Sequence, residues 1–271
     1  MGIGVIGAAG RMGQMLVRTV VETDGARLVA AIERPGSAAL GRDAGEVAGV
    51  GRLDVAVGDD PAALFQTADA VLEFSLPAAT TAHAALAAQH AKIHVIGTTG
   101  LGAEDETALA EAAKRTAIVY APNMSVVVTL AMALVEQVAG ILGPDYDIEV
   151  VEMHHRHKID APSGTAIGLG RAAARGRGVY LDQVAQWSRE GHTGARRKGD
   201  IGFAALRGGD VVGDHTVVFA GEAERLEITH RATSRQIYAR GAVRSALWAR
   251  DRAPGLYGMR EVLGLAAQTG G

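Results

Sequence analysis

Short apolar segments alternate with longer, alanine-rich segments over the first 125 residues. The short segments have the length of buried strands and occupy residues 3–6, 28–32, 53–57, 70–74, 92–96 and 117–120. The segments between them carry apolar side chains at helical spacing and occupy residues 11–21, 61–66, 78–89 and 103–115. Strands that alternate with helices in this way predict βαβ units around a parallel sheet.

The pattern changes after Asn123. A long apolar helix is predicted first, and four strands are predicted after it, over residues 126–141, 147–153, 201–206, 215–219 and 225–229. Gly/Asp turns such as Gly208-Gly209-Asp210 join the later strands, which predicts an antiparallel or mixed sheet. Residues 235–250 and 259–267 are helical again, and we expect them to pack on the first domain. The sequence therefore predicts an α/β protein whose first domain comprises residues 1–125 and 235–271 and whose second comprises residues 126–234.

Composition narrows the classes of function. The chain has 271 residues, a formal net charge of -3 and no cysteine. The lack of a basic surplus argues against a nucleic-acid partner, and the lack of cysteine excludes disulfides, thiolate metal ligands and a cysteine nucleophile. The first residues lack the charged region of a signal peptide, and we expect no segment long and apolar enough to span a membrane. Small-molecule chemistry in the cytoplasm is the resulting expectation.

A glycine-rich turn follows the first predicted strand. The segment Gly7-Ala8-Ala9-Gly10-Arg11-Met12-Gly13 has glycine at every third position and leads directly into a predicted helix. Glycines permit a tight turn and a close approach of the backbone to a pyrophosphate, and the helix N-terminus offers N–H groups to the phosphates. Glu33 lies twenty residues after Gly13, where an acid accepts hydrogen bonds from ribose hydroxyls. This context favours a dinucleotide site over a glycine-rich turn beside a charged surface pair.

Arg34 follows Glu33 and widens the expected choice of cofactor. A guanidinium beside the ribose binds the extra phosphate of NADP, so the pair predicts that NADH, NADPH or both are used. Two further strand ends, Gly97-Thr98-Thr99-Gly100 and Ala121-Pro122-Asn123-Met124, are expected at the same crevice, because parallel sheets bind ligands at the carboxyl ends of their strands. Their small and hydroxyl-bearing residues suit a nicotinamide ribose.

A second group of candidate residues lies between positions 152 and 165. His154 and Lys158 share a face whether the segment is extended or helical. Crowded cations lower the pKa values of His and Lys, which favours proton donation near neutral pH and the binding of an anion. Pro162-Ser163-Gly164-Thr165 predicts a turn into a helix capped by Ser163, whose Gly164 and Thr165 N–H groups suit a carboxylate. The segment therefore predicts an acidic substrate.

Two other interpretations of this histidine-rich segment are weaker. A metal site is disfavoured, and no metal is expected, because no nearby carboxylate completes a facial triad or a His-Glu-x-x-His helix. A solvated basic loop is the usual explanation of such a segment in an arbitrary protein. An anion-binding turn downstream of a dinucleotide domain favours a functional site instead.

These motifs resemble the 4-hydroxy-tetrahydrodipicolinate reductase family, also called the dihydrodipicolinate reductases. The resemblance is carried by Glu152-x-His154-His155-x-x-Lys158-x-Asp160-Ala161-Pro162-Ser163-Gly164-Thr165-Ala166 and by residues 7–13, 97–100, 188–194 and 241–246. It implies reduction of 4-hydroxy-tetrahydrodipicolinate, a small cyclic dicarboxylate, to tetrahydrodipicolinate by NADH or NADPH with loss of water, in diaminopimelate and lysine biosynthesis. It also implies a Rossmann-type parallel-sheet domain, a central α+β domain with an open mixed sheet, and a homotetramer.

The same resemblance implies roles for individual residues. It makes His154 the acid/base residue and Lys158 a proton donor, with substrate bound by His155, Gly164 and Thr165. The residues that it places at the cofactor are Gly7, Ala8, Ala9, Gly10, Arg11, Met12, Glu33, Arg34, Gly97, Thr98, Thr99, Ala121, Pro122, Asn123 and Met124. Met124 departs from the family pattern, in which phenylalanine is frequent at this position.

Two alternative functions follow from the dinucleotide turn alone. Another Rossmann oxidoreductase, such as a sugar or amino-acid dehydrogenase, would bind the same cofactor but would not need the cation-rich segment. A non-catalytic NAD(H)-sensing regulator would bind the cofactor without turnover, although no DNA-binding module is evident in the sequence.

Overall fold

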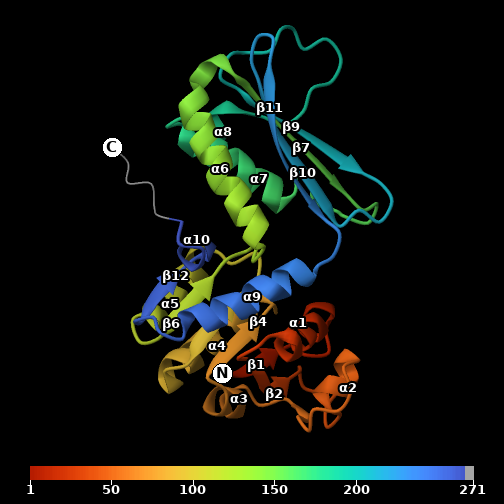
Figure 1. Ribbon diagram of the computed structural model, residues 1–271, viewed down its shortest axis with the longest axis vertical. Coiled ribbons are helices and arrows are strands. Elements are labelled where there is room, and N and C mark those ends of the chain that lie inside the picture. Colours follow the sequence, from red (N-terminus) through yellow and green to blue (C-terminus); the bar gives the residue numbers. More distant parts are fainter. Residues whose placement is uncertain (266–271) are drawn as a thin grey trace. The chain divides into compact units, whose positions relative to one another are not determined.

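The computed structural model describes residues 1–265 and divides the chain into two compact units. The first unit consists of Met1–Val126 with the described residues from Arg235 onward, and the second is Val127–Ser234. Each unit contains its own sheet (Figure 1). The helix predicted over residues 259–267 is the short α10 (Met259–Val262), and residues 266 and 267 lie outside the described part of the chain.

The first unit contains a seven-stranded parallel sheet in the order β12-β6-β5-β4-β1-β2-β3, which confirms the predicted Rossmann-type architecture. Its strands are β1 (Gly2–Ile6), β2 (Arg27–Ile32), β3 (Val57–Gly58), β4 (Ala70–Glu73), β5 (Ile93–Ile96), β6 (Ala117–Tyr120) and β12 (Gly255–Tyr257). Its helices are α1 (Arg11–Glu22), α2 (Ala44–Ala48), α3 (Pro61–Thr67), α4 (Pro77–His90), α5 (Ala103–Ala113), α9 (Gln236–Ala249) and α10. The strand order changes direction between β1 and β4, where open parallel sheets bind their ligands.

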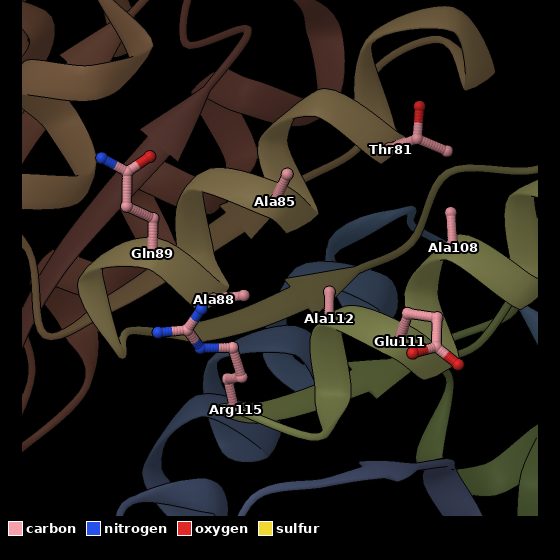
Figure 2. A pocket seen from close by; sticks show the side chains of 8 residues that line it. All are labelled: Thr81, Ala85, Ala88, Gln89, Ala108, Glu111, Ala112 and Arg115. Carbon is pink, nitrogen blue, oxygen red and sulfur yellow. The ribbon is translucent and has the colours of Figure 1, made fainter.

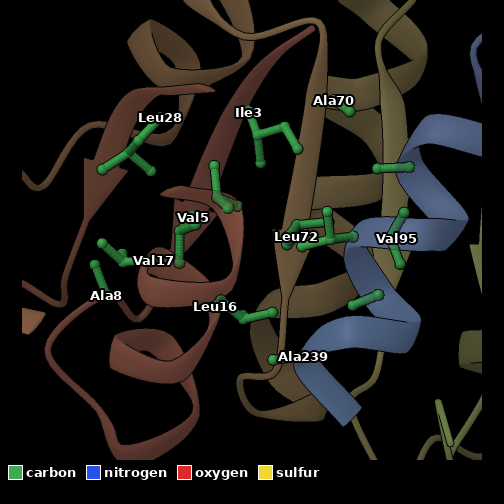
Figure 3. Packing of buried hydrophobic residues seen from close by; sticks show 14 of the residues in the cluster. Ile3, Val5, Ala8, Leu16, Val17, Leu28, Ala70, Leu72, Val95 and Ala239 are labelled. Atoms are coloured by element: carbon green, nitrogen blue, oxygen red, sulfur yellow. The ribbon is translucent and has the colours of Figure 1, made fainter. Parts of the chain in front are cut away.

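The core of this unit includes residues of both β1 and α9. Strand β1 is buried at every position, as expected for a strand covered on both faces. Ile3 and Val5 of β1 belong to the same hydrophobic cluster as Leu16 of α1, Leu72 of β4 and Ala239 of α9 (Figure 3). The α9 segment is therefore an integral part of the first unit, although it follows the second unit in the sequence.

The strand predicted over residues 53–57 is wrong for most of its length. Only Val57 belongs to β3, and Ala56 makes an isolated bridge to Asp43. The Asp43 carboxylate accepts hydrogen bonds from the backbone N–H groups of Leu53 (3.0 Å) and Val55 (3.2 Å). A loop fixed by this carboxylate therefore replaces the strand, because Asp43 takes the N–H groups that strand pairing would need.

The second unit contains the mixed sheet that the sequence predicted. Its order is β11-β10-β7-β9-β8. Strand β10 pairs antiparallel with both β11 and β7, and β9 pairs parallel with both β7 and β8. The strands are β7 (Asp147–His154), β8 (Ala185–Gln186), β9 (Ile201–Arg207), β10 (Gly213–Ala220) and β11 (Arg225–Ala232). The helices are α6 (Val126–Leu142), α7 (Gly164–Gly176) and α8 (Leu181–Val184), and a 3-10 turn, η1 (Gly143–Asp145), follows α6. Helices α6 and α7 cover one face of this sheet (Figure 1).

Helix α6 corrects the expectation about apolar segments. With the turn that follows it, it forms a stretch of 20 residues, Val126–Asp145, that is long and apolar enough to cross a membrane by length and composition. Val135 and Ala139 of this helix are buried in the core of the second unit. Glu136 is also buried and forms a 3.0 Å ion pair with Arg175 of α7. Part of the helix thus packs against α7 and the sheet.

Candidate active site

The glycine-rich turn after β1 has the geometry that a pyrophosphate site needs. Gly7 adopts a φ of 71°, a backbone conformation that favours glycine. The N–H groups of Gly7 and Ala8 donate to the Ile32 carbonyl (2.9 and 3.0 Å), which ties the turn to β2. A Cβ on Gly13 would lie 2.0 Å from the Gly7 carbonyl oxygen, so only glycine lets α1 begin this close to the turn. Among the described residues no side chain caps α1 at Gly10, which leaves N–H groups of its first turn for a ligand.

Glu33 and Arg34 stand beside this turn, at the end of β2. Glu33 is half-buried, and its Oε1 lies 3.8 Å from the position that a Cβ on Gly7 would take. Arg34 is exposed, and within residues 1–265 its guanidinium forms no hydrogen bond or ion pair. Glu33 therefore places a carboxylate close to the glycine-rich turn. Arg34 adds a neighbouring cation that has no ion-pair partner among the described residues.

The strand end after β5 is held by buried contacts. A Cβ on Gly97 would lie 2.2 Å from the Phe74 ring, so the ring fills the space that another residue would need. Thr98 is 2% exposed, and its hydroxyl accepts a hydrogen bond from the Ser75 N–H (3.2 Å). Thr99 is exposed. The Thr98 side chain thus fixes the turn, and only its backbone is left for contact with a ligand.

The strand end after β6 combines exposed and buried residues. The Ala121 N–H donates to the Ile96 carbonyl (3.1 Å), and Pro122 is exposed. The Asn123 Oδ1 accepts a hydrogen bond from the Ser125 N–H (2.9 Å). Met124 is fully buried in the core of the first unit. Together with the preceding turns, these residues place the predicted cofactor set at the carboxyl ends of β1, β2, β5 and β6.

The candidate catalytic His154 lies on the buried face of β7, after a series of apolar residues on that face. Along β7, burial alternates so that Ile148 and Val150 face the helix-covered core, and Glu152 and His154 occupy the next two positions on that face. Strand pairing places His215 of β10 opposite Glu152. Two titratable side chains therefore replace apolar ones at the carboxyl end of β7, within the buried layer.

Glu152 is the centre of this polar cluster. Its carboxylate is 1% exposed and accepts hydrogen bonds from His154 Nδ1 (2.5 Å), from both Arg207 terminal nitrogens (2.9 Å each) and from the Ser163 N–H (3.1 Å). Burial by itself raises the pKa of Glu152, but hydrogen bonds from Arg207 and His154 outweigh it and hold the pKa below its ordinary value. The ionised carboxylate keeps the proton of His154 on Nδ1, which leaves Nε2 to exchange a proton.

The segment after β7 corrects two expectations about Lys158. Strand β7 ends at His154, and the Lys158 N–H donates to the His155 carbonyl (3.1 Å) in a turn, so the shared strand or helix face is wrong. Lys158 Nζ donates to both Asp160 oxygens (2.7 and 2.8 Å) and holds the pKa of Asp160 below its ordinary value. The predicted crowding of cations is also corrected, because Glu152 pairs with His154 and Asp160 pairs with Lys158, so the chain itself supplies anions.

The helix start after this turn forms as the sequence predicted. Ser163 is the N-cap of α7, and its hydroxyl accepts a hydrogen bond from the Ala166 N–H (3.2 Å), which confirms the predicted cap. Gly164 and Thr165 are the first two residues of the helix. Because the Ser163 N–H is bonded to Glu152, this helix start lies beside the Glu152–His154 pair.

His215 is a member of the cluster that the motifs missed. Its Nε2 lies 3.0 Å from the Ser163 hydroxyl, and its ring centroid lies 5.1 Å from that of His154 and 6.3 Å from that of His230 on β11. Burial and the neighbouring His154 lower the pKa of His215 to about 4, while Glu152 opposes the shift. The sequence signal for His215 is a histidine in place of an apolar residue at a buried position of the alternating segment 213–219.

His215 should make the second unit sensitive to acid. Because its folded pKa of about 4 lies below the ordinary value of 6.5, the unfolded chain binds a proton first as the pH falls, and the free energy of unfolding decreases between these values. The decrease due to this group is about 3 kcal/mol. The measurement is urea unfolding of the wild type and of His215→Gln at pH 7 and pH 4. The variant should lose less stability than the wild type, and equal losses would contradict the assignment.

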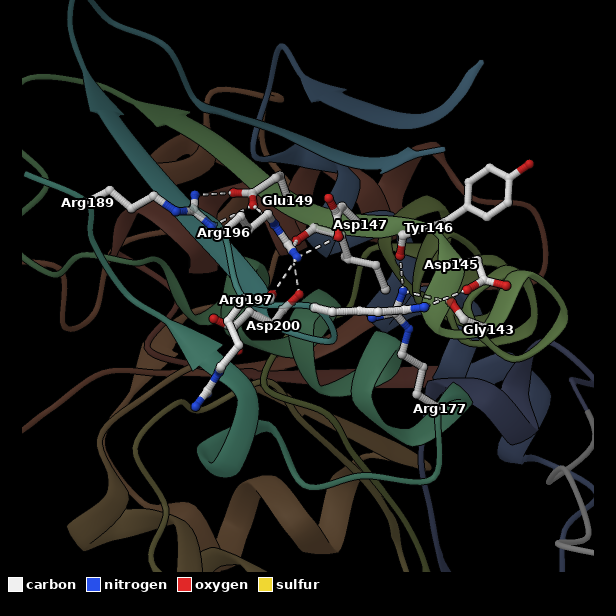
Figure 4. A network of polar contacts seen from close by, with 12 residues as sticks. Gly143, Asp145, Tyr146, Asp147, Glu149, Arg177, Arg189, Arg196, Arg197 and Asp200 are labelled. Carbon is white, nitrogen blue, oxygen red and sulfur yellow. Dashed lines mark hydrogen bonds and ion pairs between the residues drawn. The ribbon is translucent and has the colours of Figure 1, made fainter. Parts of the chain in front are cut away.

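The motif at residues 188–194 lies in the loop between β8 and β9 and is held by ion pairs (Figure 4). Arg189 donates two hydrogen bonds to Glu149 (2.7 and 2.8 Å), and Arg196 bonds Glu149 (3.0 Å) and Asp147 (2.7 Å). Burial raises the pKa of Glu149, but the two guanidinium groups outweigh it and lower the pKa overall. These arginines are therefore matched by carboxylates on β7, and their contacts fix the loop.

A surface pocket lies between α4 and α5 of the first unit, and none of these residues lines it (Figure 2). Its polar lining consists of Thr81, Gln89, Glu111 and Arg115, and the remaining lining residues are alanines. No predicted site residue contributes to it. Among residues 1–265, no group of three or more His, Asp or Glu side chains is arranged to hold a metal ion.

A parallel-sheet unit with a dinucleotide turn, followed by a unit with a carboxylate-held histidine, defines an oxidoreductase of the Rossmann class. Family models for "Dihydrodipicolinate reductase, N-terminus" and "Dihydrodipicolinate reductase, C-terminus" match residues 1–124 and 127–263. The chain belongs to the dihydrodipicolinate reductase family, which confirms the resemblance carried by its motifs.

Individual relatives agree over nearly the full length. A protein of Mesorhizobium japonicum named 4-hydroxy-tetrahydrodipicolinate reductase 1 is 55% identical, covering 98% of both chains. A 4-hydroxy-tetrahydrodipicolinate reductase of Ruegeria pomeroyi is 57% identical, covering 97% of this chain and 98% of its own. The solved structure of a dipicolinate-bound dihydrodipicolinate reductase from Paenisporosarcina sp. TG-14 has the same fold, with a TM-score of 0.76, 24% identity, and coverage of 96% of this chain and 98% of that one.

Proposed function

We propose that the protein reduces 4-hydroxy-tetrahydrodipicolinate to tetrahydrodipicolinate, with loss of water, in diaminopimelate and lysine biosynthesis in the cytoplasm. The observation that carries the proposal is the buried Glu152–His154 pair beside the start of α7, in a chain whose full-length relatives bear the name of this reductase. The nicotinamide cofactor is NADH, NADPH or both.

The residues of the first unit fit a nicotinamide dinucleotide. The turn at residues 7–12 and the uncapped start of α1 are suited to the pyrophosphate, and Glu33 to the ribose hydroxyls. The strand ends at residues 97–99 and 121–124 hold the nicotinamide side. When bound, the reduced nicotinamide supplies a hydride. The contribution of these residues is to bind and orient the dinucleotide.

The residues of the second unit suit a dicarboxylate that must take up a proton. The overall reaction replaces a C–OH bond by a C–H bond, releases water and consumes one proton. His155 and the N-terminal residues of α7, Gly164 and Thr165, bind the substrate carboxylates. His154 Nε2 and Lys158 Nζ hold and deliver the proton, a contribution of about 10²- to 10⁴-fold to the rate.

The direct test is an assay with freshly generated 4-hydroxy-tetrahydrodipicolinate. Purified protein mixed with this compound and NADH or NADPH should consume the reduced nucleotide, as measured by loss of its absorbance. Folded protein that binds NADH without consuming it would contradict the reductase and support a sensing role. Turnover only with sugars or amino acids would support another dehydrogenase.

Arg34 should set the affinity for NADPH. Its unpaired guanidinium is suited to the additional phosphate of NADPH, which NADH lacks. Arg34→Ala should raise the Kd for NADPH about tenfold or more, and the Kd for NADH less than about twofold. Fluorescence titration of both nucleotides measures the difference. The matched control is Arg27→Ala, at the exposed opposite end of β2, and equal losses for the two nucleotides in Arg34→Ala would contradict the phosphate role.

We also propose that the open face of the second sheet forms a homotetramer. On the face away from α6 and α7, Val151, Met153 and Val218 are half-buried and Leu206 is exposed, so the single chain leaves apolar side chains there partly uncovered. Light scattering after size exclusion should give four times the chain mass of 28.0 kDa. A monomer at micromolar concentration would contradict this proposal.

A further inference from the structure

A second buried carboxylate, Glu73, lies at the end of β4 in the first unit. Its side chain is fully buried, although the strand is otherwise apolar. Glu73 Oε1 receives hydrogen bonds from His83 Nδ1 (2.8 Å) and from the Ser75 hydroxyl, and Oε2 receives one from His94 Nε2 (2.8 Å). The Thr80 hydroxyl lies 3.3 Å from Oε1. Four side chains from β5, α4 and the turn after β4 therefore converge on one carboxylate.

These contacts keep Glu73 ionised. Burial raises its pKa, but hydrogen bonds from His83 and His94 outweigh burial and hold the pKa far below its ordinary value. Each imidazole places one ring nitrogen on the carboxylate, and within residues 1–265 the other ring nitrogen of His94 is buried without a hydrogen-bond partner. A buried ionised group of this kind is a weak source of net stability compared with apolar packing.

The network leads from Glu73 to the strand end after β5. Thr80 Oγ1 lies 3.2 Å from Thr98 Oγ1, and Thr98 Oγ1 accepts the Ser75 N–H (3.2 Å). Both threonine side chains are at most 2% exposed. The Thr80 hydroxyl is a donor with three acceptors in reach, Glu73 Oε1, Thr98 Oγ1 and the Leu76 carbonyl (3.2 Å). It therefore connects the carboxylate to the Thr98 turn, while the Ser75 hydroxyl connects the same carboxylate to the turn after β4.

We propose that Glu73, His83, His94 and Thr80 form a positioning cluster that sets the turns after β4 and β5 for nucleotide binding. The cluster lies beneath the carboxyl ends of two adjacent strands, where parallel sheets bind their ligands. The inference rests on the proposed nucleotide site. None of the four residues needs to touch the nucleotide, because Thr98 transmits their position to the Gly97–Thr99 backbone.

Removal of one hydroxyl tests the cluster. Thr80→Val has nearly the same shape but cannot link Glu73 to Thr98, and it should raise the Kd for NADH about tenfold in fluorescence titration. Thr80→Ser keeps the hydroxyl and should stay within about twofold of the wild type. Thr19→Val is the matched control, since Thr19 is also buried and, within the described part of the chain, its hydroxyl bonds only the Met15 carbonyl of its own helix (2.8 Å). It should leave the Kd unchanged.

A second variant keeps the test decisive if Thr80→Val folds poorly. Thr98→Val removes the other hydroxyl of the same link and should raise the Kd to a similar extent. In the double variant the loss should be smaller than the sum of the two single losses expressed as free energies, because both changes remove the Thr80–Thr98 hydrogen bond. Unchanged Kd in Thr80→Val, or equal losses in Thr80→Ser and Thr80→Val, would overturn the proposal. Wild-type protein that binds NADH but does not turn over would contradict only the proposed reductase function.

Discussion

Replacement of Lys158 by alanine is expected to lower kcat of the reductase by about 10²- to 10⁴-fold, while the Kd for NADH stays within about twofold. Lys158 lies in the turn between β7 and α7, where its ammonium group is held by Asp160. The residues that we assign to the nucleotide all lie in the first unit. Stopped-flow turnover and nucleotide titration of the same preparation separate the two quantities, and comparable losses in both would contradict a proton-donating role.

Two further variants identify what Lys158 supplies. Lys198 forms a similar 2.8 Å ion pair with Asp145 in the same unit, so Lys198→Ala is the matched control and should leave kcat within about twofold. Lys158→Arg retains a positive charge for Asp160 but replaces a titratable ammonium by a guanidinium that keeps its proton. It should therefore remain about as impaired as Lys158→Ala. Recovery of activity in Lys158→Arg would show that charge alone is needed.

The Rossmann-type sheet was predictable because its elements are local and strongly periodic. Strand β1 and helix α1 follow directly from the apolar pattern and from the turn at Gly7 and Gly13. The predicted strand over residues 53–57 failed for a different reason. The Asp43 carboxylate binds the N–H groups of Leu53 and Val55, which lie ten and twelve residues away, and no apolar pattern encodes such a contact.

The candidate catalytic site was predictable only where its residues are neighbours in the sequence. The motif from Glu152 to Thr165 identifies His154, Lys158 and the start of α7. It does not identify Arg207, which lies 55 residues after Glu152 and reaches it from the neighbouring strand β9. His215 likewise meets Glu152 through the register of β10 against β7. Because register depends on pairing between distant segments, these partners require the structure.

Glu152→Gln is expected to lower kcat by about 10²-fold or more. An amide offers one acceptor oxygen and one NH₂ group, so it cannot accept from His154, Arg207 and the Ser163 N–H together. The unpaired buried donor should also lower the free energy of unfolding by about 1–3 kcal/mol. Glu149→Gln is the matched control, because Glu149 lies on the same strand and also pairs with arginines, but it bonds no histidine. Its kcat should stay within about twofold of the wild type.

A double variant separates catalysis by Glu152 itself from an effect through His154. If the carboxylate works by holding the proton on His154 Nδ1, it has nothing to orient once the imidazole is gone. Adding Glu152→Gln to His154→Ala should then cost little more than His154→Ala alone in kcat, although each single change is damaging. Losses that multiply would show that Glu152 acts on the substrate independently, and its role as a positioning residue for His154 would be wrong.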